Sequence, residues 1–402
     1  MHASAILQRC LAPVLGAMHA GRKKVLLKAV EALIAGRRLT LIDVARSWLG
    51  AERVRAPLKA LDRLLSNRHL HAERERVYAG MAQWLVRGAH PVIIVDWSDL
   101  KADQSWHVLR AAVPVGGRTL PLLDMVFPGS EHGAPKAEHR FLQRLKAVLP
   151  ADARPILVTD AGFRAPWFRA VDALGWLWLG RLRSRTLVKP IDVADQPDQW
   201  VSSRALYVLA SSTPRDLGLM HTVRNAPWVC RVVVYGRPAK GRVRRNCSGR
   251  RARSKKSLQC AARERDPWLL VASPALQNMS AQQLVALYRR RMQIEESFRD
   301  LKSHRYGQGF EDSLTRKGAR IEVLLLINAM AAFAAWIVGM ACEATGLDRW
   351  LSPRRSKRRL YSILRIGREA LVRRWPFGSI LQLIERLRHP SSELLDQLGM
   401  PG

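Results

Sequence analysis

The order of hydrophobic and polar residues divides this chain into regions with different expected secondary structure. Up to residue 88, apolar residues recur at helical spacing, which is typical of short amphipathic helices. From Pro91 onward, short apolar runs bounded by polar and turn residues indicate buried strands that alternate with helices. The pattern therefore predicts an α/β or α+β sheet, with a helical region before it and a helical tail after it.

The same pattern predicts the individual elements. Thr40 with Asp43 resembles a capping box, and Gly116 with Gly117 between two apolar runs is a hairpin signal. Two short N-terminal helices joined by a tight turn suit a helix-turn-helix DNA reader, although a small bundle that only packs has the same pattern. The predicted helices are 21–36, 40–48, 58–65, 72–87, 137–148, 166–174 and 280–302. The predicted strands are 92–95, 108–115, 119–127, 155–159, 176–182, 228–235 and 268–272.

One apolar segment is long enough to cross a membrane. Residues 323–342 contain only one polar side chain, Asn328. The segment is Ala-rich, and no second span or aromatic belt accompanies it. A helix that is apolar on all sides is equally suited to the core of a large soluble protein, so we expect a buried helix and no membrane partner.

The charge of the chain narrows the class of partner. The 67 Lys and Arg residues exceed the 33 Asp and Glu residues and give a formal charge of +34. Such an excess indicates binding to nucleic acid, the alternative being a ribosome-associated or merely soluble basic protein. Residues 237–256 carry ten Lys or Arg and no acid, and we expect a loop that contacts phosphates or is simply solvated. The five scattered cysteines and the absence of a signal peptide suggest a reducing cytoplasm.

Two aspartates close short apolar strands. Asp96 follows the run 92–95, and Asp160 follows the run 155–159. A carboxylate at the point where a buried strand ends is held rigidly at the edge of the sheet, although aspartate often ends strands only to form a turn. Asp99 competes with Asp96 for the first position, but we expect it to lie past the end of its strand.

A third acid is selected by helix geometry. Taking Tyr288 as the origin and about 100° per residue, Arg291 lies at about −60°. On the same scale Glu295 lies at about −20° and Lys302 at about −40°, whereas Glu296 lies at about +80°. The apolar positions Leu287, Ile294, Phe298 and Leu301 border this arc. An ordinary solvated face would explain the pair of Arg291 and Glu295 but not the other two residues.

Three converging carboxylates require cations to hold them together. Oxygen ligands alone suit Mg²⁺, for which Mn²⁺ can substitute. Two such ions about 4 Å apart can activate a water or a 3′-hydroxyl and stabilise the leaving oxygen in phosphodiester chemistry. Arg291 and Lys302 are then suited to holding phosphates, and Tyr288 to hydrogen bonding or stacking.

These residues carry a resemblance to a known family. The spacing of Tyr288, Arg291, Glu295 and Lys302 matches the YREK signature of a group of bacterial insertion-sequence transposases. The surrounding YRRRMQIEESFRDLK, with VDWSD at 95–99 and TDAGF at 159–163, resembles the insertion sequence four family, transposon ten type. The resemblance covers nearly the whole chain.

The resemblance implies a fold, a set of site residues and a reaction. The fold would be an RNase H-like core interrupted by a β-rich insertion, and Asp96, Asp160 and Glu295 would be the metal ligands. Trp268 would be the family's base-capping tryptophan, unless it is only a core aromatic. Similar enzymes act as homodimers on the terminal inverted repeats of their element. They cleave the ends through a DNA hairpin and join them to target DNA.

The expected organisation follows from the pattern and the resemblance together. It comprises a helical DNA-binding domain at 1–88, the first part of the core at 89–185 and the insertion at 186–278. The second part of the core would span 279–345, with a helical region at 346–402. A non-catalytic DNA-binding relative would not need the three acids, and another RNase H-like nuclease would lack the YREK spacing. The protein would act in a bacterial cytoplasm, associated with the nucleoid.

Overall fold

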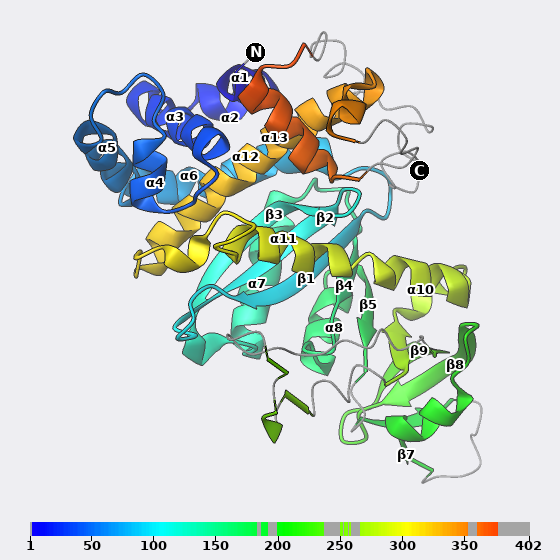
Figure 1. The fold of residues 1–402 in the computed structure, drawn as a ribbon. Coiled ribbons are helices and arrows are strands. Elements are labelled where there is room, and N and C mark those ends of the chain that lie inside the picture. Colours follow the sequence, from blue (N-terminus) through cyan, green and yellow to red (C-terminus); the bar gives the residue numbers. More distant parts are fainter. Residues whose placement is uncertain are drawn as a thin grey trace. The chain divides into compact units, whose positions relative to one another are not determined.

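The computed structural model describes residues 2–182, 186–191, 199–236, 250–251, 253–255, 257–258, 266–352 and 360–376. Contacts within the chain divide it into two compact units, drawn in Figure 1. The first unit comprises 1–155 and 291–402, and the second comprises 156–290. Both contain helices and strands, so the protein is a mixed α/β protein, as predicted. Most of the predicted basic loop at 237–256 lies outside the described residues.

The first unit begins with six helices. Thr40 caps α4 by accepting a hydrogen bond from the backbone N–H of Asp43 at 3.2 Å, as predicted from the capping pattern. Asn67 caps α6 in the same way, so this helix starts earlier than predicted. The helices are α1 (Ala3–Cys10), α2 (Ala12–Gly16), α3 (Ala20–Gly36), α4 (Leu41–Arg46), α5 (Arg55–Leu65) and α6 (Arg68–Leu85).

Three antiparallel strands follow in the first unit. They are β1 (Val92–Asp99), β2 (Trp106–Pro114) and β3 (Thr119–Pro128), with β2 in the middle. Gly116 and Gly117 form the predicted hairpin turn, with φ of 69° and 97°, because glycine adopts positive φ without strain. β1 is longer than predicted and includes Asp99, so the expectation that Asp99 lies past the strand end is wrong.

The remaining helices of the first unit complete its core. They are α7 (Pro135–Val148), α11 (Met292–Lys302), α12 (Gly318–Ala344) and α13 (Ile363–Arg373). α12 packs against α3, α6, α13 and β3, and Figure 1 shows it running among the N-terminal helices. It is long and apolar enough to cross a membrane, but 94% of its most apolar window is buried inside the protein, as expected of a core helix.

α12 and α13 approach each other closely through two glycines. A Cβ atom added to Gly367 would lie 1.7 Å from the carbonyl oxygen of Ala335. One added to Gly339 would lie 2.2 Å from the carbonyl oxygen of Ile363. Because glycine has no side chain, the two helices can approach this closely. The close approach determines where α13 and its arginines lie.

The second unit is richer in strands. β4 (Ile156–Thr159) and β5 (Leu177–Arg181) are parallel and are connected through α8 (Ala165–Asp172). Antiparallel strands follow β5 in the order β10 (Trp268–Ala272), β9 (Trp228–Tyr235), β8 (Arg215–Thr222), β6 (Leu187–Pro190) and β7 (Val201–Ser202). The bounds of β9 and β10 are those predicted. α10 (Ala281–Arg289) ends the unit.

The predicted uninterrupted helix 280–302 is wrong. α10 ends at Arg289 and α11 begins at Met292, with Arg290 and Arg291 between them. The backbone N–H of Arg290 bonds to the carbonyl of Leu287, three residues back, which tightens the last turn of α10. The boundary between the two units falls at this break. An ideal-helix projection is therefore valid for α11 but not across the break to Tyr288.

Candidate functional site

Asp96 lies in the middle of β1, where the burial pattern of the strand changes. The four residues before it are fully buried, and the two after it are half-buried. Its Oδ1 atom accepts the backbone N–H of Trp97 at 3.0 Å, which fixes the carboxylate. Because Asp96 is only 9% exposed, water stabilises its carboxylate little, and neighbouring polar or charged groups have to stabilise it instead.

α11 presents Glu295 beside β1. The helix carries three stripes of side chains, because residues three, four and seven apart share a face. Its apolar stripe, Ile294, Phe298 and Leu301, is buried and holds the helix against the strands of the first unit. Glu295 and Lys302 lie two turns apart on another stripe, with the Glu295 side chain 43% exposed. The predicted alignment of these two residues therefore holds within α11.

Arg291 joins the two acids. Its Nη1 atom lies 3.2 Å from Oδ2 of Asp96, and its Nη2 atom donates to Oε1 of Glu295. One guanidinium thus bridges two carboxylates that belong to a strand and a helix almost two hundred positions apart in the chain. Among the described residues, the pair carries one more negative charge than Arg291 balances, and the atoms that it offers to a metal ion are all oxygen. These residues fit a hard divalent cation.

The two rival acids have other partners. Asp99 faces His107 of β2, with Oδ1 and Nδ1 3.0 Å apart. Glu296 pairs with Arg299, one turn further along α11. Neither rival contacts Arg291 among the described interactions, so the geometry favours Asp96 and Glu295 over them.

Asp160 belongs to the second unit and directly follows β4. Its Oδ1 atom accepts the backbone N–H of Gly162 at 2.7 Å. This is a local turn contact, and it is the ordinary structural role that strand-end aspartates have. Within the described part of the chain, no group of three or more His, Cys, Asp and Glu residues is placed to hold a metal ion.

Tyr288 and Trp268 meet in the second unit. Their rings are 4.9 Å apart in an edge-to-face arrangement, and Trp268 also touches Tyr235. Trp268 is 6% exposed and Tyr288 is 4% exposed. Both rings are therefore packed as core aromatics here, which was the alternative to a base-capping role for Trp268.

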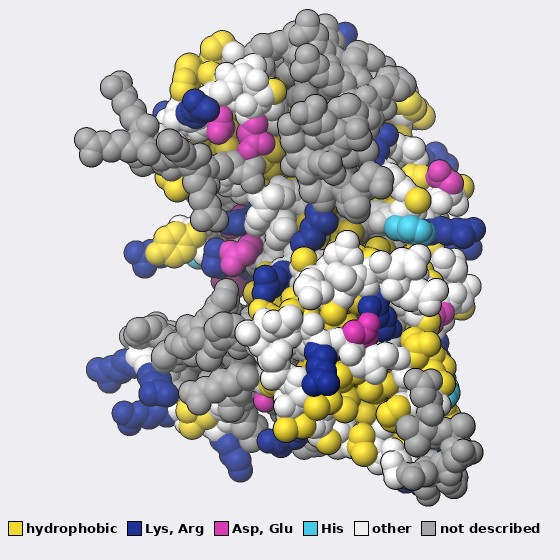
Figure 2. All heavy atoms as spheres, turned by 90° about the vertical axis from the view of Figure 1, so that its right-hand side faces the viewer, with side chains coloured by type: hydrophobic (Ala, Val, Ile, Leu, Met, Phe, Trp, Pro, Cys, Tyr) yellow, Lys and Arg dark blue, Asp and Glu magenta, His cyan; other side chains and the backbone are white. Residues whose placement is uncertain are grey.

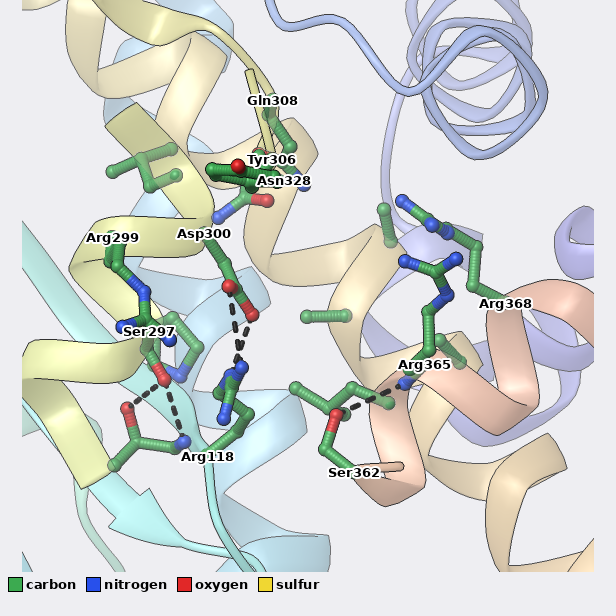
Figure 3. A pocket seen from close by; sticks show the side chains of 18 of the residues that line it. Arg118, Ser297, Arg299, Asp300, Tyr306, Gln308, Asn328, Ser362, Arg365 and Arg368 are labelled. Carbon is green, nitrogen blue, oxygen red and sulfur yellow. Dashed lines mark hydrogen bonds and ion pairs between the residues drawn. The ribbon is translucent and has the colours of Figure 1, made fainter. Parts of the chain in front are cut away.

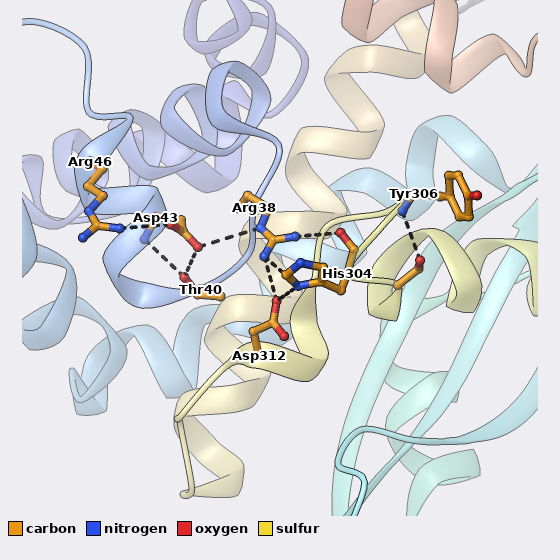
Figure 4. A network of polar contacts seen from close by, with 8 residues as sticks. Arg38, Thr40, Asp43, Arg46, His304, Tyr306 and Asp312 are labelled. Carbon is orange, nitrogen blue, oxygen red and sulfur yellow. Dashed lines mark hydrogen bonds and ion pairs between the residues drawn. The ribbon is translucent and has the colours of Figure 1, made fainter. Parts of the chain in front are cut away.

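α11 ends at Lys302. Hydrogen bonds and ion pairs connect the loop that follows to the N-terminal helical region of the same unit. Arg38 donates to Oδ2 of Asp312 at 2.7 Å and to the carbonyl oxygen of His304 at 2.8 Å. His304 also contacts Asp312, and Asp43 lies 3.9 Å from Arg38 (Figure 4). This network holds the C-terminal end of α11 in place.

The residues that hold the other side of α11 were not predicted. Gln293 accepts the backbone N–H of Gly117 at 2.9 Å, and Ser297 accepts that of Thr119 at 2.8 Å. Asp300 accepts from Arg118 at 2.6 Å. Their i, i+4, i+7 spacing places them on one stripe, and this signal was present in the sequence. The hairpin turn therefore fixes the rotation of α11 at which Arg291 bridges Glu295 and Asp96.

The fold and the site define a mixed α/β protein with a carboxylate pair suited to a divalent cation. The sequence profile of the family described as "Transposase DDE domain" matches residues 87–334. The match covers more than half of the chain, so the chain belongs to this family. All seven predicted site residues lie within the matched region.

Two further comparisons add little. The comparison with curated protein sequences gave no match. Among solved structures, a chain of a piggyBac transposase synaptic complex with hairpin DNA aligns with 11% identity. The alignment covers 98% of this chain and 81% of that chain, with a TM-score of 0.39.

Proposed function

We propose that this protein is a cut-and-paste DNA transposase. It cleaves the ends of its element by metal-dependent phosphodiester chemistry, through a hairpin intermediate, and joins the ends to target DNA. Membership of the transposase family supports this proposal. The single structural observation that carries it is the convergence of Asp96 and Glu295 on Arg291.

The metal ligands in this proposal are Asp96, Asp160 and Glu295. DDE transposases generally use divalent metal ions, and carboxylate ligands favour Mg²⁺ with Mn²⁺ as a substitute. Two such ions, when bound, supply activation of a water or 3′-hydroxyl nucleophile and stabilisation of the leaving oxygen. The core that carries the ligands is proposed to be RNase H-like, interrupted by the β-rich insertion.

The basic side chains have a separate role. Arg291 bridges the two carboxylates, and its guanidinium would be available to a DNA phosphate if a bound cation took its place between them. Lys302, on the Glu295 face of α11, is proposed to hold a second phosphate. Tyr288 and Trp268 are proposed to contact DNA, which requires exposure of rings that are now buried.

The surface supports DNA as the partner. Lys and Arg side chains are spread over the face drawn in Figure 2, with fewer acids between them. On α5, Arg55, Lys59 and Arg63 are exposed and recur every four residues, so they form one basic face. We propose that the N-terminal helices bind the terminal inverted repeats. The active form is proposed to be a homodimer in a bacterial cytoplasm.

A neighbouring pair of glutamates provides the test. Glu295→Gln should lower Mg²⁺-dependent cleavage of labelled DNA from the flanks of the gene by about a thousandfold, about 4 kcal/mol of barrier. Glu296→Gln removes the same charge from the next position and should cleave within about threefold of wild type. Both variants should bind the DNA ends equally. Wild-type cleavage by Glu295→Gln would contradict the proposal.

The products separate the proposal from its alternatives. A transposase yields element ends joined to an unrelated plasmid, whereas another RNase H-like nuclease yields cleavage alone. A non-catalytic relative binds the ends and cleaves nothing at any Mg²⁺ or Mn²⁺ concentration.

A further inference from the structure

A cavity of about 690 Å³ opens in the first unit, and neither Asp96 nor Glu295 lines it. Its walls come from α11, α12, α13 and the β2–β3 hairpin (Figure 3). Pockets of about 300–1,000 Å³ bind molecules of the size of a nucleotide, and a DNA duplex is too wide to enter one. Size therefore restricts the ligand to a small molecule or to a single unpaired unit of a polymer.

The wall formed by α13 carries an excess of positive charge. Glu369, which is 3% exposed, is the carboxylate shared by four guanidinium groups. Its partners are Arg37, Arg365, Arg368 and Arg373, at 2.5, 3.2, 3.7 and 3.3 Å. Arg365 and Arg368 line the cavity, and Figure 3 shows both side chains on the α13 wall. Three positive charges in this cluster remain unbalanced, which favours an anion.

The opposite wall does not cancel this charge. Asp300 is the acid that faces the cavity there, and Arg118 pairs with it at 2.6 Å, so the two are neutral together. Burial, together with Arg37 and Arg365, lowers the pKa of Arg368 to about 10. The charged form of Arg368 is thus destabilised in this surrounding, and a bound anion would relieve that cost.

Two residues that line the cavity also carry buried polar atoms without hydrogen bonds. Nε of Arg368 and Oε1 of Gln308 are buried and have no hydrogen-bond partner within the described chain. Asn328 is the polar side chain within the apolar part of α12, and it lines the cavity together with Tyr306. Figure 3 draws Tyr306, Gln308 and Asn328 on one side of the cavity. Buried donors and acceptors normally have partners, so the unsatisfied atoms make this wall polar, and the Asn328 amide that lines it is suited to a ligand with a polar edge.

We propose that this cavity binds one unpaired nucleotide of a DNA strand, with its phosphate on Arg365 and Arg368 and its base edge on Asn328 and Gln308. Amide groups donate and accept in the plane of a base edge, and Tyr306, which is 74% exposed, offers a ring for stacking. The inference rests on the proposed function only in taking DNA as the source of the nucleotide.

Binding without metal tests the inference separately from catalysis. The full chain is titrated in EDTA with a labelled duplex carrying one unpaired nucleotide, and with the same duplex abasic at that position. Wild type should bind the first on the order of tenfold more tightly than the second. Asn328→Leu should reduce this preference to about one, because it removes the amide contact with the base.

Two arginines of the Glu369 cluster provide matched variants. Arg368→Gln should weaken binding of both duplexes on the order of tenfold and should lower the salt dependence of binding, because a phosphate contact is lost. Arg373→Gln removes the same charge from Glu369 but does not line the cavity, and it should stay within about twofold of wild type. Melting temperatures should confirm that all variants are folded.

Three results would overturn the inference. Equal loss by Arg368→Gln and Arg373→Gln would show a general charge effect. An unchanged preference in Asn328→Leu would show that the cavity does not contact the base. A free deoxynucleoside monophosphate that binds as tightly as the duplex would make a free nucleotide, and not DNA, the ligand. None of these results bears on whether Glu295 is required for cleavage.

Discussion

Two charged clusters in the first unit have opposite imbalances. At the carboxylate pair, Asp96 and Glu295 share one guanidinium, that of Arg291. On α13, four guanidinium groups share one carboxylate, that of Glu369. Counted over the described residues, the first cluster has an excess negative charge and suits a cation, whereas the second has excess positive charges and suits an anion.

A third cluster shows how this protein builds a purely structural ion pair. Arg110 and Asp124 lie opposite each other on β2 and β3, and both are fully buried, at 1% and 0% exposure. Two parallel contacts of 2.6 and 2.7 Å join them, so the charges match and the geometry is bidentate. Balance and complete burial accompany a structural role here. Imbalance and partial exposure accompany the two clusters to which we assign ligands.

The balanced pair should give the largest loss of stability. Asp124→Ala leaves the Arg110 charge buried without its partner and should lower the free energy of unfolding by about 3–5 kcal/mol. Urea denaturation of the full chain measures this. Glu131→Ala removes the partner of Arg140 in an exposed pair and should cost less than about 1 kcal/mol. If the two variants lost equal stability, burial would not determine how much an ion pair contributes to the stability of this protein.

The arginine-rich cluster should give a smaller and pH-dependent loss. The Glu369 side chain is 4% exposed, and burial opposes its ionisation, but Arg37 and the neighbouring arginines outweigh burial and lower its pKa. A lowered pKa in the folded state contributes stability above the unfolded value of about 4.3, and this stability is lost as the pH falls through the folded value. Glu369→Gln should therefore cost about 1.5–3 kcal/mol at neutral pH and progressively less in acid.

The pH profile distinguishes this cluster from an ordinary surface site. The difference between the unfolding free energies of wild type and Glu369→Gln is measured from pH 7 downward. A difference that stays constant through the acid range would mean that the arginines do not act on the Glu369 charge. The same measurement on Asp62→Asn provides a comparison, because Asp62 is 55% exposed in its ion pair with Arg320.

The sequence alone predicted the elements whose ends are marked by local chemistry. β9 and β10 are bounded by turn residues, and the hairpin turn depends on Gly116 and Gly117, so these features were predicted correctly. The break between α10 and α11 was missed because Arg290 and Arg291 both have helical backbone angles and neither is Gly or Pro. Nothing in the local pattern marks the end of α10.

Contacts between distant parts of the chain could not be predicted from the sequence pattern. Arg37 and Glu369 are 332 positions apart, and only the close approach of α12 and α13 brings the arginine cluster to a cavity. The choice of Glu295 over Glu296 could be made from helix geometry, because both lie within α11. The link from Glu295 through Arg291 to Asp96 depends on the contacts of Gln293, Ser297 and Asp300 with the β2–β3 hairpin. The spacing of these three residues is visible in the sequence, but their partners are not.

The smallest expected effect concerns Arg291 itself. Arg291→Gln removes the positive charge shared by Asp96 and Glu295 and should cost about 1 kcal/mol in EDTA, because Glu295 is partly exposed. Added Mg²⁺ should raise the melting temperature of this variant more than that of wild type, since the cation no longer competes with a guanidinium for the carboxylates. Arg299→Gln, which loses only the Glu296 pair on the same helix, should respond to Mg²⁺ as wild type does. An identical Mg²⁺ response in all three proteins would contradict cation binding at this pair, and the contrast between a cation site and an anion site would then fail.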